Sequence, residues 1–213
     1  MRAMPMDCAS MPGMAGGAWL AAASFIGMWT LMMAGMMLPS LVPMLRHYHD
    51  AVRRSGGSRH LAPLTLVVSA GYFAVWTAAG VIAFAVTSLQ RETMIPALAP
   101  LAVGIVAVLA GAVQFTPWKA HHLACCRDTP AVVAPGIAAA WRHGLRLGGH
   151  CTCASAGPMA VLLAAGLMDP QAMAIVTAAI TVERLAPARL PIAKVVGAAL
   201  LVWGLTAAGV RVT

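Results

Sequence analysis

The chain has 213 residues, of which 61% are hydrophobic and only 9% are charged, and its uncharged runs are long enough to cross hydrocarbon. This composition excludes an ordinary soluble domain and predicts an integral membrane protein, all-α and built as a polytopic bundle of transmembrane helices. The formal net charge of +8 is explained by cations beside anionic lipid, so it does not indicate nucleic-acid binding.

Residues 1–18 form a Met-rich tail that lacks the form of a signal peptide. Within it, five methionines surround Cys8: Met1, Met4, Met6, Met11 and Met14. Thioethers select Cu(I) over harder ions, so the tail fits a weak copper collector, and the alternative is a low-complexity initiator region. Residues 19–213 are predicted to form a single transmembrane domain.

Six stretches of the chain are candidates for membrane spans. Three are free of charged residues and long enough for a span of about 20 residues: Trp19–Leu45, Leu61–Leu89 and Met94–Trp118. Three are shorter: Cys151–Met168, Pro170–Val182 and Val195–Val210. We therefore predict about six spans, with five as the alternative count.

Methionine also recurs inside the first span. Met28, Met32 and Met36 lie four residues apart and would share one face of a helix. Such a stripe is either core packing or a path for a soft cation leading inward from the Met-rich tail. Pro39 and Pro43, late in the same span, are expected to bend it.

The segment PWKAHHLACCR follows the third span and carries four potential metal ligands. On a helix, His121 lies beside Cys125 and His122 lies beside Cys126, because residues four apart are neighbours. Imidazole and thiolate groups suit a thiophilic metal, Cu(I) first and Zn(II) as the alternative.

A second cluster, His150, Cys151 and Cys153, stands at the start of the fourth candidate span. Both clusters fall on the same side of the predicted membrane, so neighbouring helix ends could join them in one metal site. The alternative is that these residues are buried small hydrophobes and interfacial histidines.

The long connection Thr129–Gly149 interleaves Trp and Leu with Arg and His. This pattern predicts a short amphipathic helix on the membrane surface. Further on, Asp169 precedes Pro170 and is expected to be a turn or cap residue. Glu183 is expected to pair with a nearby cation, namely Arg184, Arg189 or Lys194, or to face the metal.

The distribution of cations predicts the orientation. With six spans, eleven of the fourteen Lys and Arg residues fall in loops on one side. Because such residues accumulate in the cytoplasm, both termini are predicted outside it and the His/Cys clusters at the cytoplasmic face of a cytoplasmic (inner) membrane.

Four motifs, MMLPS, QFTPxK, GLMD and VERLAP, resemble those of a bacterial family of uncharacterised, predicted metal-binding integral membrane proteins. The resemblance covers nearly the whole chain after about Trp19, and it implies a metal-binding membrane protein. Many members carry Cys where this chain has His122, and a Cys pair where it has Ala154 and Ser155. Cys126 and Cys151 match the family pattern.

The sequence contains no phosphate-binding loop, no nucleotide-binding glycine fingerprint and no Ser/His/Asp arrangement, so we expect no enzyme. The predicted function is binding of a soft metal, copper above zinc, and its transfer, insertion or transport. The expected partners are the lipid bilayer and a metal-donating or metal-accepting protein or a larger membrane complex.

Two other classes remain open. One is a structural or assembly subunit of a membrane complex with no metal of its own. The other is a membrane thiol-disulfide oxidoreductase, which the lack of a Cys-x-x-Cys motif and the strained ring that Cys125 and Cys126 would close both disfavour.

Overall fold

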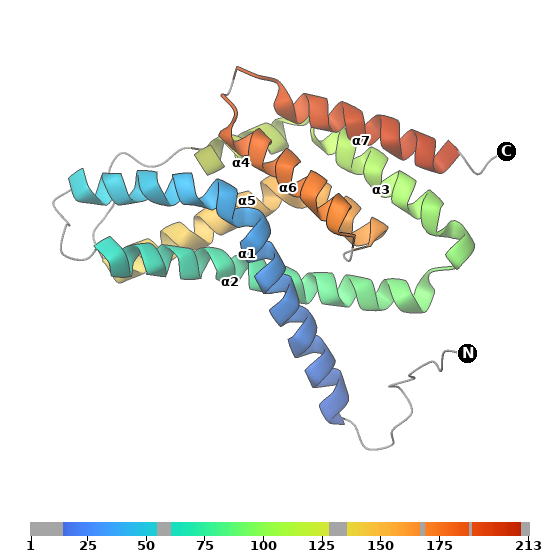
Figure 1. The fold of residues 1–213 in the computed structure, drawn as a ribbon, viewed down its shortest axis with the longest axis horizontal. Helices are drawn as coiled ribbons and strands as arrows, with labels where there is room; N and C mark the ends of the chain where they lie inside the picture. The colour runs from blue at the N-terminus through green and yellow to red at the C-terminus, as the bar shows by residue number, and fades with distance from the viewer. Residues whose placement is uncertain (1–14, 55–60, 128–135, 167–168, 188, 210–213) are drawn as a thin grey trace.

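The computed structural model describes residues 15–54, 61–127, 136–166, 169–187 and 189–209. Within these ranges the chain forms seven α-helices and a short 3₁₀ helix, η2, and no strand. The helices are α1 (Ala15–Arg54), α2 (Leu61–Thr93), η2 (Pro96–Leu98), α3 (Ala99–Val113), α4 (Pro117–Arg127), α5 (Ile137–Ala165), α6 (Pro170–Leu185) and α7 (Ile192–Gly209). The predicted all-α bundle is confirmed (Figure 1). Cys8 and the five methionines of the tail lie outside the described residues.

Four of these helices, α1, α2, α5 and α7, are long and apolar enough to cross a membrane. Helices α3 and α4 add a fifth span if they are counted as one broken helix, bent by 68°. Helix α6 has only 16 residues, which is about 24 Å at 1.5 Å per residue and shorter than the roughly 30 Å hydrocarbon layer. The described helices therefore give five spans at most. This number agrees with the alternative prediction of five spans and not with the prediction of six.

The prediction of a separate amphipathic surface helix before the fourth span is wrong. Helix α5 runs without a break for 29 residues from Ile137 to Ala165, so both segments belong to one helix. The reason lies in its packing, because Gly144 and Leu147 are buried against neighbouring helices in the part that the charged residues marked as a surface segment.

Helix α1 changes direction part of the way along its 40 residues, where Pro39 and Pro43 interrupt its backbone hydrogen bonds (Figure 1). The half that follows the bend runs beside the first turns of α2 and α5. Residues from the three helices form a small core of their own there: Tyr48, Ala51, Val52, Leu64, Val68 and Ala140. Beyond the bend, the bundle therefore consists of α1, α2 and α5 packed together.

Helices α2 and α5 approach each other closely over glycines. A Cβ atom on Gly144 would overlap the backbone oxygen of Val68, and one on Gly71 would lie 2.8 Å from the backbone oxygen of Trp141. Helices α3 and α7 use the same arrangement, since a Cβ on Gly104 would lie 2.9 Å from the oxygen of Gly204. Small residues at such crossings let backbones pack tightly without a large side chain between them.

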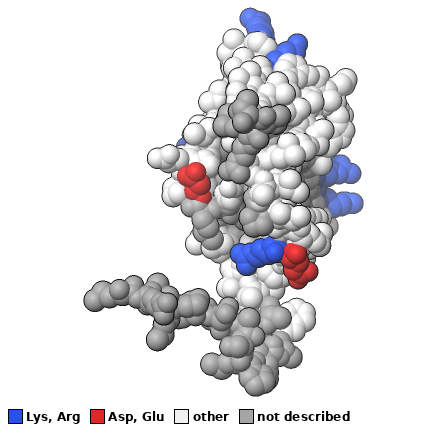
Figure 2. All heavy atoms as spheres, turned by 90° about the vertical axis from the view of Figure 1, so that its right-hand side faces the viewer, with Lys and Arg blue, Asp and Glu red and all other residues white. Residues whose placement is uncertain are grey.

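The outer surface of the bundle is largely apolar. Leu31, Leu66 and Ile175 are each about 70% exposed or more. Figure 2 shows one side of the molecule, where charged atoms are confined to a few places and uncharged atoms cover most of the face. This surface is compatible with a membrane protein.

Substitution of Gly144 tests the α2–α5 crossing. Gly144→Ala should lower the free energy of unfolding by about 1–3 kcal/mol, because the new methyl group meets a fixed backbone oxygen. Gly149→Ala on the same helix is the matched control, since nothing lies within 4 Å of its Cβ position, and alanine there should be neutral or stabilising. Thermal unfolding in detergent, followed by helical circular dichroism, measures both, and equal midpoints would contradict the packing.

Candidate metal centre

The two predicted ligand clusters meet where α4 packs on α5. Helix α4 begins at Pro117, whose missing N–H suits a first helical position, and the Thr116 hydroxyl accepts a hydrogen bond from the backbone N–H of Lys119. On the next turn, the Nδ1 atom of His122 lies 2.9 Å from the Nδ1 atom of His150 on α5. Residues 28 positions apart in the sequence are thus direct neighbours.

His121 and Cys125 form a second pair on the exposed side of α4, with 3.7 Å between Nε2 and Sγ. The His121 ring centroid lies 5.4 Å from that of His122 and 6.3 Å from that of His150. Three imidazoles and one thiol therefore share one surface. In the part of the chain that the structure describes, no three His, Cys, Asp or Glu side chains converge as a group that could hold a metal ion.

The two remaining cysteines of the prediction separate from this surface. Cys126 is 2% exposed and points into the main core, while His122 turns to His150 instead of to Cys126. Cys151 is fully buried in the same core. Cys153 is partly buried and, two positions further along α5, lies on a different side of that helix.

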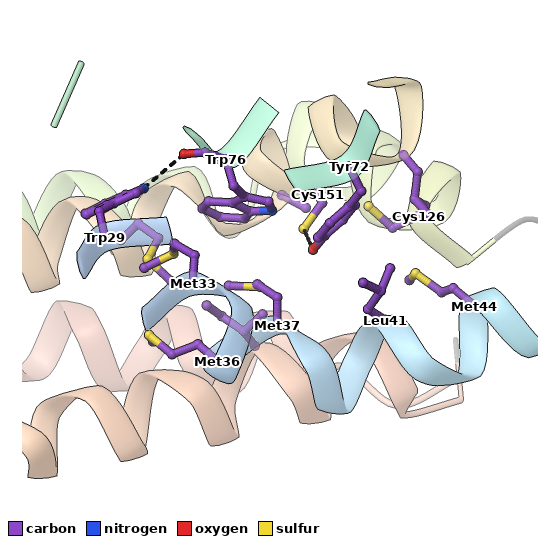
Figure 3. Close-up of a cluster of buried hydrophobic side chains, with 14 of the residues drawn as sticks. Trp29, Met33, Met36, Met37, Leu41, Met44, Tyr72, Trp76, Cys126 and Cys151 are labelled. Carbon is purple, nitrogen blue, oxygen red and sulfur yellow. Dashed lines mark hydrogen bonds between the residues drawn. The ribbon is translucent and has the colours of Figure 1, made fainter. Parts of the chain in front are cut away.

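The core around Cys126 and Cys151 is rich in methionine. Both cysteines share one cluster with Met33, Met36, Met37 and Met44 of α1 (Figure 3). Of the predicted stripe, only Met36 is buried in this cluster. Met32 is partly buried against it and Met28 is 40% exposed. The buried face of α1 therefore carries Met33 and Met37, which directly follow Met32 and Met36 of the predicted stripe.

A buried ion pair lies next to the two cysteines. The Lys119 ammonium group donates to the Glu183 carboxylate over 2.8 Å, and both side chains are almost wholly buried. Gln114 donates to the other carboxylate oxygen over 3.1 Å, and Lys119 also donates to the backbone oxygen of Ala154. Arg127 donates to the backbone oxygen of Glu183.

The expectation that Glu183 pairs with Arg184, Arg189 or Lys194 is wrong. Its partner is Lys119, because the side chain of Glu183 points across the bundle to α4 and away from the end of its own helix. Arg184, the next residue, points to a different neighbour.

Arg184 is only 4% exposed and joins three helices. Its guanidinium group donates to the Ser40 hydroxyl of α1 over 3.3 Å, and to both the backbone oxygen and the sulfur of Cys151 on α5. The Tyr72 hydroxyl of α2 lies 2.7 Å from the same sulfur. Cys151 is thus held among polar groups inside an apolar core.

Sequence reasoning missed four members of this network: Ser40, Tyr72, Gln114 and Lys119. The signal was present for three of them, since Ser40 ends the MMLPS motif and Gln114 and Lys119 belong to QFTPxK. Polar residues inside long apolar helices are costly unless they are paired, so they indicate buried contacts. Tyr72 belongs to none of the motifs, and the sequence does not indicate which residue its hydroxyl contacts.

Asp169 was predicted to be a turn or cap residue, and this is confirmed. Its carboxylate accepts hydrogen bonds from the backbone N–H groups of Gln171 and Ala172 at the start of α6. Pro170 occupies the first position of that helix, as expected for a proline after a capping residue.

Comparison with known proteins gives a family match. The family model described as "PpoB2: Copper chaperone" matches residues 26–207, which is most of the chain. The chain therefore belongs to this copper chaperone family. The search of curated proteins and the search of solved structures gave no match.

Removing one partner of the buried ion pair should destabilise the bundle. Glu183→Gln should lower the free energy of unfolding by about 3–5 kcal/mol, because it leaves the Lys119 charge buried without compensation. Glu92→Gln is the matched control, because Glu92 is exposed near the end of α2. Denaturant or thermal unfolding in detergent measures the difference. A loss in Glu183→Gln no larger than in Glu92→Gln would contradict the structural role of the pair.

Proposed function

From the membership of this chain in the copper chaperone family, we propose that it is a polytopic integral membrane protein that binds Cu(I) and passes it to a partner. The cargo is copper, and the chain acts by binding and transfer and catalyses no covalent reaction. The partner is a copper-accepting or copper-donating protein, or a larger membrane complex.

The observation that carries this proposal is the meeting of His122 and His150 between α4 and α5, with His121 and Cys125 on the same surface. Imidazole and thiolate are ligands that copper accepts. His121 is exposed and the other three are partly buried, so a partner can reach the metal from the His121 side. A site made of ligand pairs also suits a carrier, because a cargo held by few ligands can be exchanged.

The same arrangement favours Cu(I) over Zn(II). Structural zinc takes four ligands in a tetrahedron. The described His and Cys side chains come together in pairs instead, and no larger ligand group is formed among them. Cu(I) is stable with fewer, softer ligands, and the buried cysteines and methionines nearby supply such atoms.

The proposed orientation places this surface at the cytoplasmic face of a bacterial cytoplasmic membrane. Its support is the distribution of cations, because Arg53, Arg54, Arg142 and Arg146 stand in the end of the bundle formed by the second half of α1 and the start of α5. Lys and Arg gather at the cytoplasmic ends of membrane helices.

Metal loading tests this function. Detergent-purified protein, loaded with Cu(I) or Zn(II) and desalted, should retain near-stoichiometric copper and much less zinc by elemental mass spectrometry. Protein that stays metal-free after both loadings would contradict the proposal and would favour the alternative of a structural subunit, for which the buried ion network is sufficient.

The four ligands of the α4–α5 surface should control the exchange of copper. A variant with His121→Ala, His122→Ala, Cys125→Ser and His150→Ala should transfer Cu(I) to or from a soluble chelator at least about tenfold more slowly than wild type, since changes around a metal site typically cost 10–100-fold. His47→Ala is the control, because His47 is an exposed histidine on α1 outside this surface. Equal exchange rates in the three proteins would exclude the α4–α5 surface as the transfer site.

A further inference from the structure

Two buried thiols lie next to the α4–α5 surface ligands in the sequence. Cys126 comes from α4 and Cys151 from α5, and neither is more than 2% exposed. They belong to one core cluster, and Arg184 donates to both the backbone oxygen and the sulfur of Cys151. Figure 3 shows both sulfur atoms beside Tyr72, with Met44 of α1 in the same cluster.

The surroundings of the Cys151 sulfur are rich in hydrogen-bond donors. Arg184 donates to it and the Tyr72 hydroxyl lies 2.7 Å away. The Trp76 indole N–H is also buried and has no hydrogen-bond partner, and in Figure 3 its nitrogen points toward Cys151. A neutral thiol is a weak acceptor, so such a set of donors is better suited to a negatively charged sulfur.

The described residues include one more buried cation than buried carboxylates. Among the residues that the structure describes, Lys119 and Arg184 are the buried cations and Glu183 is the buried carboxylate. Glu183 is matched by Lys119. Within the same residues Arg184 forms no salt bridge to a carboxylate. An isolated charge in an apolar core is costly, so an anion is expected beside the guanidinium group.

We propose that Cys126 and Cys151 form an interior Cu(I) site in which Arg184 supplies the counter-charge. This inference rests on the proposed function, since it assigns the place where the same cargo is held. When Cu(I) binds, each thiol loses its proton to solvent and both sulfurs coordinate the metal. The resulting complex of two thiolates and one Cu(I) carries one net negative charge, which the single guanidinium group of Arg184 matches.

In this site Arg184 is a positioning residue, because it acts on the metal through Cys151. Tyr72 has the same role, because its hydroxyl lies 2.7 Å from the Cys151 sulfur. The surface residues His121, His122, Cys125 and His150 then lie on the route by which copper reaches the buried pair. Cys126 follows Cys125 on α4, and Cys151 follows His150 on α5.

Anaerobic titration of the detergent-purified full chain with Cu(I), against a competing chelator, tests the site through the ultraviolet thiolate-to-Cu(I) charge-transfer absorption. Cys126→Ser and Cys151→Ser should each abolish this absorption, and the double variant should lose no more. The matched control is Cys153→Ser on α5, whose partly buried thiol lies on a different side of that helix, and this variant should keep the absorption.

The counter-charge has its own test in the same titration. Arg184→Gln should weaken Cu(I) binding about 10–100-fold. Arg184→Lys should recover part of the affinity, because it keeps the charge and loses the planar fork of donors. If Arg184→Gln does not fold, Tyr72→Phe decides, since it keeps the ring and removes one donor, and it should also weaken binding.

The possible negative results distinguish three parts of the proposal: copper binding, the interior site and the counter-charge of Arg184. Wild-type protein that binds no copper contradicts the proposed function itself. Copper that binds without thiolate absorption, or absorption that survives in Cys126→Ser, contradicts the interior site alone. Wild-type affinity in folded Arg184→Gln, or in Tyr72→Phe where Arg184→Gln is unfolded, contradicts the counter-charge.

Discussion

The fold depends on the buried ion pair between Lys119 and Glu183. Inside an apolar bundle neither charge can be left alone, so the helices must come together such that the two charges meet. Lys119 and Gln114 reach Glu183 from the two sides of the break between α3 and α4, and Arg127 contacts its backbone oxygen. The pair therefore fixes where α3 ends, how α4 turns and where α6 lies.

The residue after Glu183 carries the same constraint to the cysteines. Since consecutive residues on a helix point in different directions, α6 directs Glu183 to α4 and Arg184 to Ser40 and Cys151. One helix turn thus connects the ion pair to the sulfur-rich core. In the proposed function, the network that holds the bundle together also sets the charge around the metal, so structural stability and copper affinity are coupled properties of this protein.

Much of this architecture was predictable from the sequence because it is local. The helical class, the bend at the prolines of α1 and the cap at Asp169 follow from hydropathy and from neighbouring residues. The adjacency of the His/Cys clusters followed from helix order. The partner of Glu183 did not, because Lys119 is 64 positions away and only the folded bundle selects it. The continuity of α5 could not be predicted either, because it depends on contacts between its buried glycines and α2, which is distant in the sequence.

In the proposed site, copper is held by sulfur inside the bundle and exchanged by histidine at its surface. X-ray absorption at the copper K edge, on wild-type protein carrying one equivalent of Cu(I), distinguishes sulfur from nitrogen neighbours of the metal. We expect a spectrum dominated by sulfur neighbours, which becomes dominated by nitrogen when Cys126 and Cys151 are both replaced by Ser. A nitrogen-dominated spectrum that is the same in both proteins would contradict the proposed site.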